Sequence, residues 1–95
     1  MANLITIGTT TSAWFDVTVA AGSPKTLFII DTGAGVPIAS GPKYELAHKT
    51  SGSAYNVIAE LNTNNILQFG GLAFPGVYGV RRIANGYSSG MDVEG

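Results

Sequence analysis

The stretch AWFDVTV, residues 13–19, decides the fold class of this 95-residue chain. One face of an extended strand takes Phe15, Val17 and Val19, and the polar residues between them take the other face. Such a two-residue period is typical of a β-strand with one buried face. Outward from this stretch, KYELAHK (43–49) and VYGVRRI (77–83) alternate in the same way.

Turn residues divide the rest of the chain into short runs. Clusters of glycine, proline and serine recur throughout, as in AAGSP (20–24) and FPG (74–76). The run TLFII (26–30) is apolar on both faces, which predicts a central strand covered from each side. The run AYNVIAEL (54–61) fits either a strand or an amphipathic helix, and its aromatic and β-branched residues favour the strand.

These runs predict an all-β fold: a single antiparallel β-sandwich, Ig-like or jelly-roll-like, with about seven short strands. Residues 1–95 form one domain, because a chain of this length supports one modest core. The final segment GYSSGMDVEG is rich in glycine and serine, so we expect a loose C-terminal tail from about residue 86.

Composition argues against several classes of function. Charged residues make up 12% of the chain, five basic and six acidic, with no basic patch for nucleic acid or an anionic membrane. The chain has no cysteine and one histidine, His48, so we expect no metal site and no cofactor. No apolar run approaches the roughly 20 residues of a membrane span. Weak charge protects poorly against self-association, which favours a protein that works in an assembly.

The string IIDTGA, residues 29–34, is the most enzyme-like part of the chain. Asp31 would supply a carboxylate, Thr32 a hydroxyl that braces the loop, and Gly33 the close approach of backbone to carboxylate. Over about ten residues this resembles the retroviral-type aspartic proteases. The resemblance implies a homodimer in which each subunit contributes one aspartate to a pair that shares a proton.

Two further features of that family are poorly matched. The segment KTSGSAYNV (49–57) has a single glycine where a glycine-rich flap is needed, and the residues after Asn85 make a poor C-terminal helix. Alternatively, Asp31 ends a strand and accepts hydrogen bonds from the amides of Gly33 or Ala34. We therefore expect no catalytic residues and no enzyme activity, with the protease as the alternative.

Three longer segments carry a second resemblance: TSAWFDVTVAAGSPKTLFI (11–29), SAYNVIAEL (53–61) and FPGVYGVRRIANGYSSGMDVEG (74–95). Together they are similar to the small β-sandwich virion proteins of tailed bacteriophages. The pattern is an apolar turn, a Gly-x-Tyr strand ending in basic residues, and a Gly-x-Asp-x-Glu ending, matched here by Gly76, Tyr78, Arg81, Arg82, Gly90, Asp92 and Glu94.

The phage resemblance implies a capsid decoration or cement protein that binds and stabilises the assembled shell. Its partners would be the major capsid protein or another virion protein, and copies of itself in a dimer or trimer. It would be made in the host cytoplasm and reside in the virion. A tail or tail-fibre accessory domain is the alternative within the same class.

Candidate interface residues combine apolar loop positions with arginine, which is suited to polar anchoring. They are Trp14, Phe69, Leu72, Phe74, Arg81 and Arg82. Alternatively, the loop 69–75 closes one end of the core. Tyr78 is expected to bury its ring and turn its hydroxyl onto nearby backbone, as tyrosines at sandwich corners do.

Overall fold

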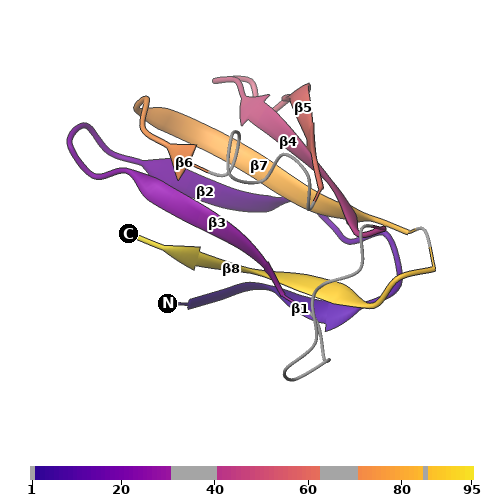
Figure 1. Cartoon of the computed structure of the whole chain (residues 1–95). Coiled ribbons are helices and arrows are strands. Elements are labelled where there is room, and N and C mark those ends of the chain that lie inside the picture. Colours follow the sequence, from indigo (N-terminus) through magenta and orange to yellow (C-terminus); the bar gives the residue numbers. More distant parts are fainter. Residues whose placement is uncertain (1, 31–40, 63–70, 85) are drawn as a thin grey trace.

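The computed structural model of this chain describes residues 2–30, 41–62, 71–84 and 86–95, and the regular structure in them is entirely β (Figure 1). In chain order the strands are β1 (Ala2–Gly8), β2 (Phe15–Val19), β3 (Lys25–Ile30), β4 (Lys43–Lys49), β5 (Tyr55–Leu61), β6 (Gly71–Leu72), β7 (Gly76–Ile83) and β8 (Ser89–Glu94). The predicted all-β antiparallel sandwich is confirmed, with eight strands in place of about seven.

The strands form two four-stranded sheets, in the orders β1-β8-β3-β6 and β2-β7-β4-β5. The antiparallel pairs β4–β5, β3–β6, β2–β7 and β1–β8 are nested in the sequence. The chain is thus one long two-stranded ribbon, with the β4–β5 turn at its tip, rolled so that successive parts fall in alternate sheets. This is the topology of a jelly roll, which decides between the two forms of sandwich expected from the sequence.

The inward faces of the two sheets form one core. On β2, Val17 and Val19 are buried, as the alternation predicts, and on β7 the same face carries Tyr78 and Val80. Each of the described strands contributes at least one buried apolar side chain. The set is Ile5, Val17, Val19, Leu27, Ile29, Tyr44, Leu46, Leu61, Leu72, Tyr78, Val80 and Met91.

Strand β3 is central, but only one of its faces is covered. It lies between β8 and β6, and it buries Leu27 and Ile29 against the other sheet. Phe28 points to the opposite side and leaves 37% of its surface exposed. The expectation of cover on both faces was wrong, because a two-layer sandwich leaves the outer face of each sheet to solvent.

Strand β8 replaces the expected loose C-terminal tail. Residues 89–94 pair with β1 on one side and β3 on the other, and Ser89 and Met91 are buried. Gly90, a residue that suggested looseness, permits close packing: a Cβ there would lie 2.5 Å from the carbonyl oxygen of Ile5. The tail prediction is therefore wrong for this segment.

Strand β5 confirms the strand expected for the ambiguous segment 54–61. Its register against β4 shifts by one residue, since Leu46 pairs with Ala59 and Ala47 pairs with Val57. Ile58 is the extra residue of this bulge. Val57 and Ile58 are both largely exposed, whereas Leu61 at the end of the strand reaches the core.

Candidate functional site

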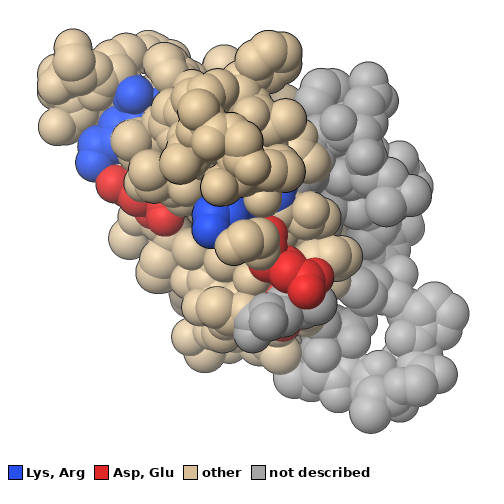
Figure 2. Space-filling view, turned by 90° about the vertical axis from the view of Figure 1, so that its left-hand side faces the viewer, with Lys and Arg blue, Asp and Glu red and all other residues tan. Residues whose placement is uncertain are grey.

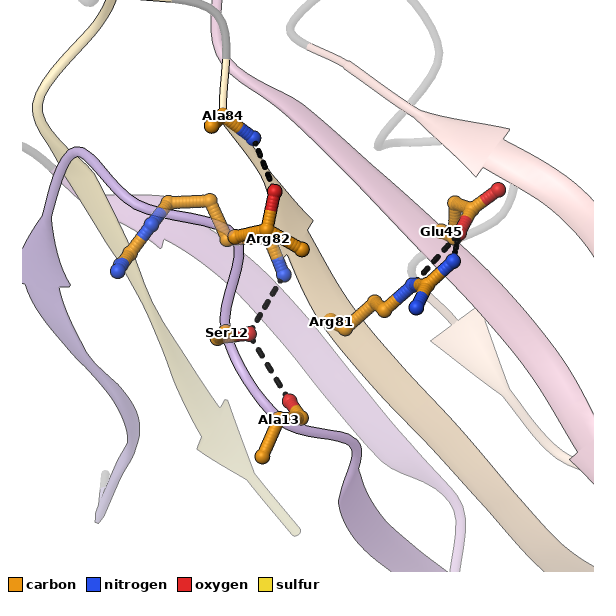
Figure 3. A network of polar contacts seen from close by, with 7 residues as sticks. Ser12, Ala13, Glu45, Arg81, Arg82 and Ala84 are labelled. Carbon is orange, nitrogen blue, oxygen red and sulfur yellow. Dashed lines mark hydrogen bonds and ion pairs between the residues drawn. The ribbon is translucent and has the colours of Figure 1, made fainter.

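The two predicted arginine anchors leave β7 in opposite directions (Figure 3). Arg81 points to the outer face of its sheet, where Glu45 of β4 lies. Arg82 follows the inward face of β7, and only 6% of its surface is exposed. Neighbouring residues of one strand thus have separate environments, which decide what each can do.

Arg82 ties the N-terminal part of the chain to both sheets. Its Nη1 donates to the carbonyl oxygens of Thr6 and Ser89, at 2.8 Å each, and its Nε donates to that of Thr10 at 2.7 Å. Its own amide and carbonyl both bond to Ser12. Main-chain carbonyls thus take the place of water as hydrogen-bond acceptors for this buried guanidinium. Arg82 is therefore a structural clamp, and the folded chain does not present its guanidinium to a partner.

A buried hydroxyl pair lies beside this clamp. The Tyr44 hydroxyl and Ser89 Oγ are 2.8 Å apart, and both side chains are almost fully buried. Burial raises the pKa of Tyr44, and its hydrogen bond to Ser89 and the positive Arg82 oppose that shift in part. The neutral phenol is thus the form that suits the folded protein.

Arg81 is paired within its own sheet. Its Nε and Nη2 both reach Oε1 of Glu45, at 2.7 and 2.6 Å. The same guanidinium lies 4.7 Å from the centre of the Trp14 ring, a cation–π contact. Arg81 and Trp14 are thus partly exposed but already engaged with each other.

The Trp14 ring has a second partner. Its ring stacks on that of Tyr55, with centroids 4.8 Å apart and planes at 8°, and Lys49 lies over Tyr55 at 5.4 Å. Both rings sit above Gly79, where an added Cβ would collide with Tyr55. The resulting series, which we call the outer stack, runs Arg81, Trp14, Tyr55 and Lys49. Trp14 directly precedes β2, and the other three residues lie on β7, β5 and β4.

Asp16 supplies the negative charge that faces Lys49 and Tyr55 of the outer stack. Lys49 Nζ donates to it at 2.7 Å and the Tyr55 hydroxyl at 2.5 Å. The Lys49 hydrogen bond, followed by that of Tyr55, lowers the pKa of Asp16. The same contacts raise the pKa of Lys49 and of Tyr55. Because each ring and both cations already have partners within the sheet, the outer stack does not offer an open aromatic platform to a ligand.

The apolar interface candidates near the β6–β7 turn also differ from one another in burial. Leu72 is 7% exposed and belongs to the core, so the folded chain does not present it to a partner. Phe74, two residues later, is 81% exposed. The Tyr78 hydroxyl donates to the Phe74 carbonyl at 3.0 Å, which confirms the corner contact expected for this tyrosine. Phe69 lies outside the described residues.

The protease alternative rests on Asp31, Thr32 and Gly33, which also lie outside the described residues. Near the C-terminus, where a retroviral-type protease would place a short helix, residues 89–94 form strand β8 instead. Within the described ranges there is no group of three or more acidic or histidine side chains that could hold a metal ion. Nor do those ranges contain a helix able to cross a membrane.

Sequence reasoning missed four members of this region: Asp16, Glu45, Lys49 and Tyr55. Asp16, Glu45 and Lys49 stand at outward strand positions, which the alternation does indicate. Strict alternation places Tyr55 on the face of the buried Leu61, and the bulge at Ile58 turns it outward instead. The register that brings opposite charges together, such as Glu45 opposite Arg81, depends on which strands become neighbours. That information is not local in the sequence.

No family model, curated protein or solved structure matches this chain. Its function is therefore argued from the geometry above together with the resemblances in its sequence.

Proposed function

We propose that this chain is a structural protein of a tailed-phage virion that binds the outside of the assembled capsid and stabilises it. The protein acts by binding and does not catalyse a reaction. Its partner is the major capsid protein or another virion protein, and it is incorporated into the particle after synthesis in the host cytoplasm.

The observation that carries this proposal is that few charged side chains are both exposed to water and free of an ion-pair partner in the described residues. Arg82 is buried, Arg81 is paired with Glu45, and Lys49 is paired with Asp16. On the face seen in Figure 2, charged atoms form small groups of both signs, and most of the described surface is uncharged. Such a surface is poorly protected against association and suits a protein that stays in an assembly.

The jelly-roll topology is compatible with this proposal without selecting it. Viral capsid proteins, lectins and cupins all use such double-sheet folds, and a fold alone does not fix a function. A lectin-like use of the partly exposed Trp14 is disfavoured, because Tyr55 and Arg81 already pack against its ring. The phage resemblance in the sequence therefore supplies the choice among these classes.

The mechanism of stabilisation is mass action. A protein that binds the closed shell, and binds free subunits weakly, lowers the free energy of the shell by its own binding free energy. The effect grows with the concentration of the decorating protein. It requires no chemical step and no cofactor.

The test is to add purified protein to expanded, undecorated capsids of the phage that carries its gene. We expect co-sedimentation with the capsids and a higher temperature of capsid disruption. If neither occurs, decoration is wrong. Binding to isolated tails instead would identify a tail accessory domain. A peptidase activity that Asp31→Asn abolishes would identify the protease.

A further inference from the structure

Three turns meet at one end of the jelly roll: β2–β3 (20–24), β4–β5 (50–54) and β6–β7 (73–75). The pairing of Val19 with Gly76 brings the first and third together, and that of His48 with Tyr78 brings the second alongside. The turns β2–β3 and β6–β7 project at the left of Figure 1, the side on which both chain ends are also marked. We call these three turns the turn face.

The turn face is uncharged. Its residues are alanine, glycine, serine, threonine, proline and Phe74, with no acidic or basic side chain among them. All of them except Thr50 are exposed. Figure 2 looks onto this end and shows a surface that is mostly neither basic nor acidic. The described charges nearest to it are on strands, such as Lys25, which donates to the carbonyl of Gly95, and the Lys49–Asp16 pair.

Each turn of this face is held by its own hydrogen bonds. Ser23 N donates to Ala20 O at 3.0 Å in the β2–β3 turn, in which Gly22 has a φ of +78°. In the β4–β5 turn, the amides of Thr50 and Ser53 donate to Ala54 and Thr50, at 2.9 Å each. The turns are therefore ordered before any partner binds, which reduces the entropy lost on association.

Phe74 is the largest side chain on this face, and at 81% it is the most exposed of the large apolar residues that the structure describes. The Tyr78 hydroxyl fixes its carbonyl, Pro75 restricts the next φ, and Gly76 has a φ of +150°, which favours glycine. The backbone that carries the ring is thus fixed, whereas the ring itself is exposed and touches little of its own chain. An exposed aromatic side chain on an ordered turn is a typical interface anchor.

We propose that the turn face is the surface that docks on the capsid, and that Phe74 inserts into an uncharged apolar socket on a protein of the shell. This inference rests on the proposed function and assigns its binding surface. It transfers the anchoring role from the predicted Leu72 and Arg82, which are buried, to Phe74.

The chemistry of the turn face defines that of the socket. A charged group of the partner would lose its water against these turns without gaining a counter-ion, so the covered part of the shell protein must be neutral. A second copy of this chain is a poorer occupant. The small side chains around Phe74, such as Ala20, Ala21 and Ala73, cannot wall a socket for a phenyl ring, which a self-complementary contact would need.

The test compares matched variants for binding to undecorated capsids. Phe74→Ala removes the anchor, and Phe28→Ala makes the same change on the outer face of β3. Ala21→Lys places a charge in the turn face, and Thr18→Lys places one on the outer face of β2. Thermal unfolding of each variant checks that the fold is retained; Phe74 contributes only its carbonyl to the hydrogen bond with Tyr78.

We expect Phe74→Ala to weaken capsid binding about 30-fold or more, as for a central anchor. Ala21→Lys should weaken it too, with both controls within about threefold of wild type. Wild-type affinity should change little between low and high salt, because no charge is expected at the contact.

Binding of Phe74→Ala at wild-type strength, or an equal loss in Phe28→Ala, would overturn the assignment of the turn face while leaving decoration intact. Failure of the wild-type protein to bind at all would remove the proposed function and this inference together. A wild-type oligomer that Phe74→Ala converts to monomer in sedimentation would show that the occupant is a second copy, and the capsid socket would then be wrong.

Discussion

Arg81 and Arg82 are adjacent in the chain, carry the same charge and lie on the same strand, but they have opposite roles. Arg82 is enclosed by carbonyls from β1, the β1–β2 connection and β8. Arg81 lies on the outer face, between a carboxylate and an indole ring. The strand period alone places them on different sides, and the cost of disturbing each follows from what surrounds it.

Arg82 connects the main chain of separate strands and loops, whereas Arg81 connects only side chains on the outer face of one sheet. Removing Arg82 would leave several main-chain carbonyls without a donor in a place with little water. Removing Arg81 would expose a carboxylate and a ring edge to solvent that can replace the lost contacts. We therefore expect substitutions of Arg82 to lower the free energy of unfolding strongly, and substitutions of Arg81 to lower it only slightly.

Arg82→Met should give the largest loss of stability, about 3–5 kcal/mol in the free energy of unfolding. Three carbonyl acceptors lose a charged donor, and methionine fills the volume without replacing any bond. Arg82→Lys keeps the charge but cannot reach all three carbonyls, so it should lie between methionine and wild type. Urea denaturation measures both. Arg81→Met is the matched control, with an expected loss of about 1 kcal/mol or less; equal losses at the two positions would refute the division of roles.

Two glycines allow the surroundings of Arg82 and the outer stack to be compared in a second way, since one lies against each. A Cβ at Gly8 would lie 2.8 Å from Arg82 Nη2, and a Cβ at Gly79 would collide with the Tyr55 ring. Arg82 is held by three carbonyls and cannot move aside cheaply, so Gly8→Ala should cost about 1–2 kcal/mol. In Gly79→Ala the Tyr55 ring can swing into solvent, so stability should change less.

The readout for Gly79→Ala is fluorescence, because Trp14 is the single tryptophan of the chain. Displacement of Tyr55 should alter Trp14 emission in the folded state, whereas Gly8→Ala should leave it unchanged. A large loss of stability in Gly79→Ala with unchanged emission would mean that the outer stack is as rigid as the inner clamp.

The comparison also shows what the sequence could and could not predict. Alternation in AWFDVTV identified the buried Val17 and Val19 correctly, because a strand period is local. It placed Arg82 on the same face as Tyr78 and Val80, but an arginine at an inward position gave no hint of the carbonyls that would accept from it. Those belong to residues 6, 10 and 89, and only the rolled topology brings them together.

Strand β8 was missed for a related reason. Ser89, Met91 and Val93 alternate with Asp92 and Glu94, so the strand signal was present in the sequence. Its glycines, however, favour the prediction of a loose end. The need for Gly90 becomes visible only when β1 packs against it, with the Ile5 carbonyl where a side chain would be. Glycine that permits close approach and glycine that loosens a chain look the same until the neighbour is known.

Alkaline pH should test the inner region through Tyr44. Burial raises the pKa of Tyr44 above its ordinary value of 10.0, so the unfolded chain loses this proton first. The stabilisation is complete below about pH 10 and is lost as pH rises through the folded pKa. The thermal stability of the wild type should therefore fall as the pH rises above about 10.

In Tyr44→Phe the fall over that range should be shallower, although the variant is less stable at neutral pH because the bond to Ser89 is lost. Tyr55→Phe serves as the comparison, since the pKa of Tyr55 is also raised but its ring lies in the outer stack. If the two variants reduce the alkaline slope equally, burial of Tyr44 is not what controls it.

Acid should test the outer stack through Asp16, with the smallest effect of all. The hydrogen bonds from Lys49 and Tyr55 lower the pKa of Asp16 below its ordinary 3.8, so folding favours the ionised form. This contribution is present above about pH 4 and is lost as pH falls through the folded pKa. Because Asp16 is largely exposed, Asp16→Asn should cost about 0.5 kcal/mol or less at neutral pH. The difference between wild type and Asp16→Asn in thermal unfolding should shrink from pH 5 to pH 2 and should also shrink in high salt.

A difference that persists at pH 2 would mean that Asp16 acts through packing and not through its charge. The outer stack would then resemble the inner clamp more than the geometry implies.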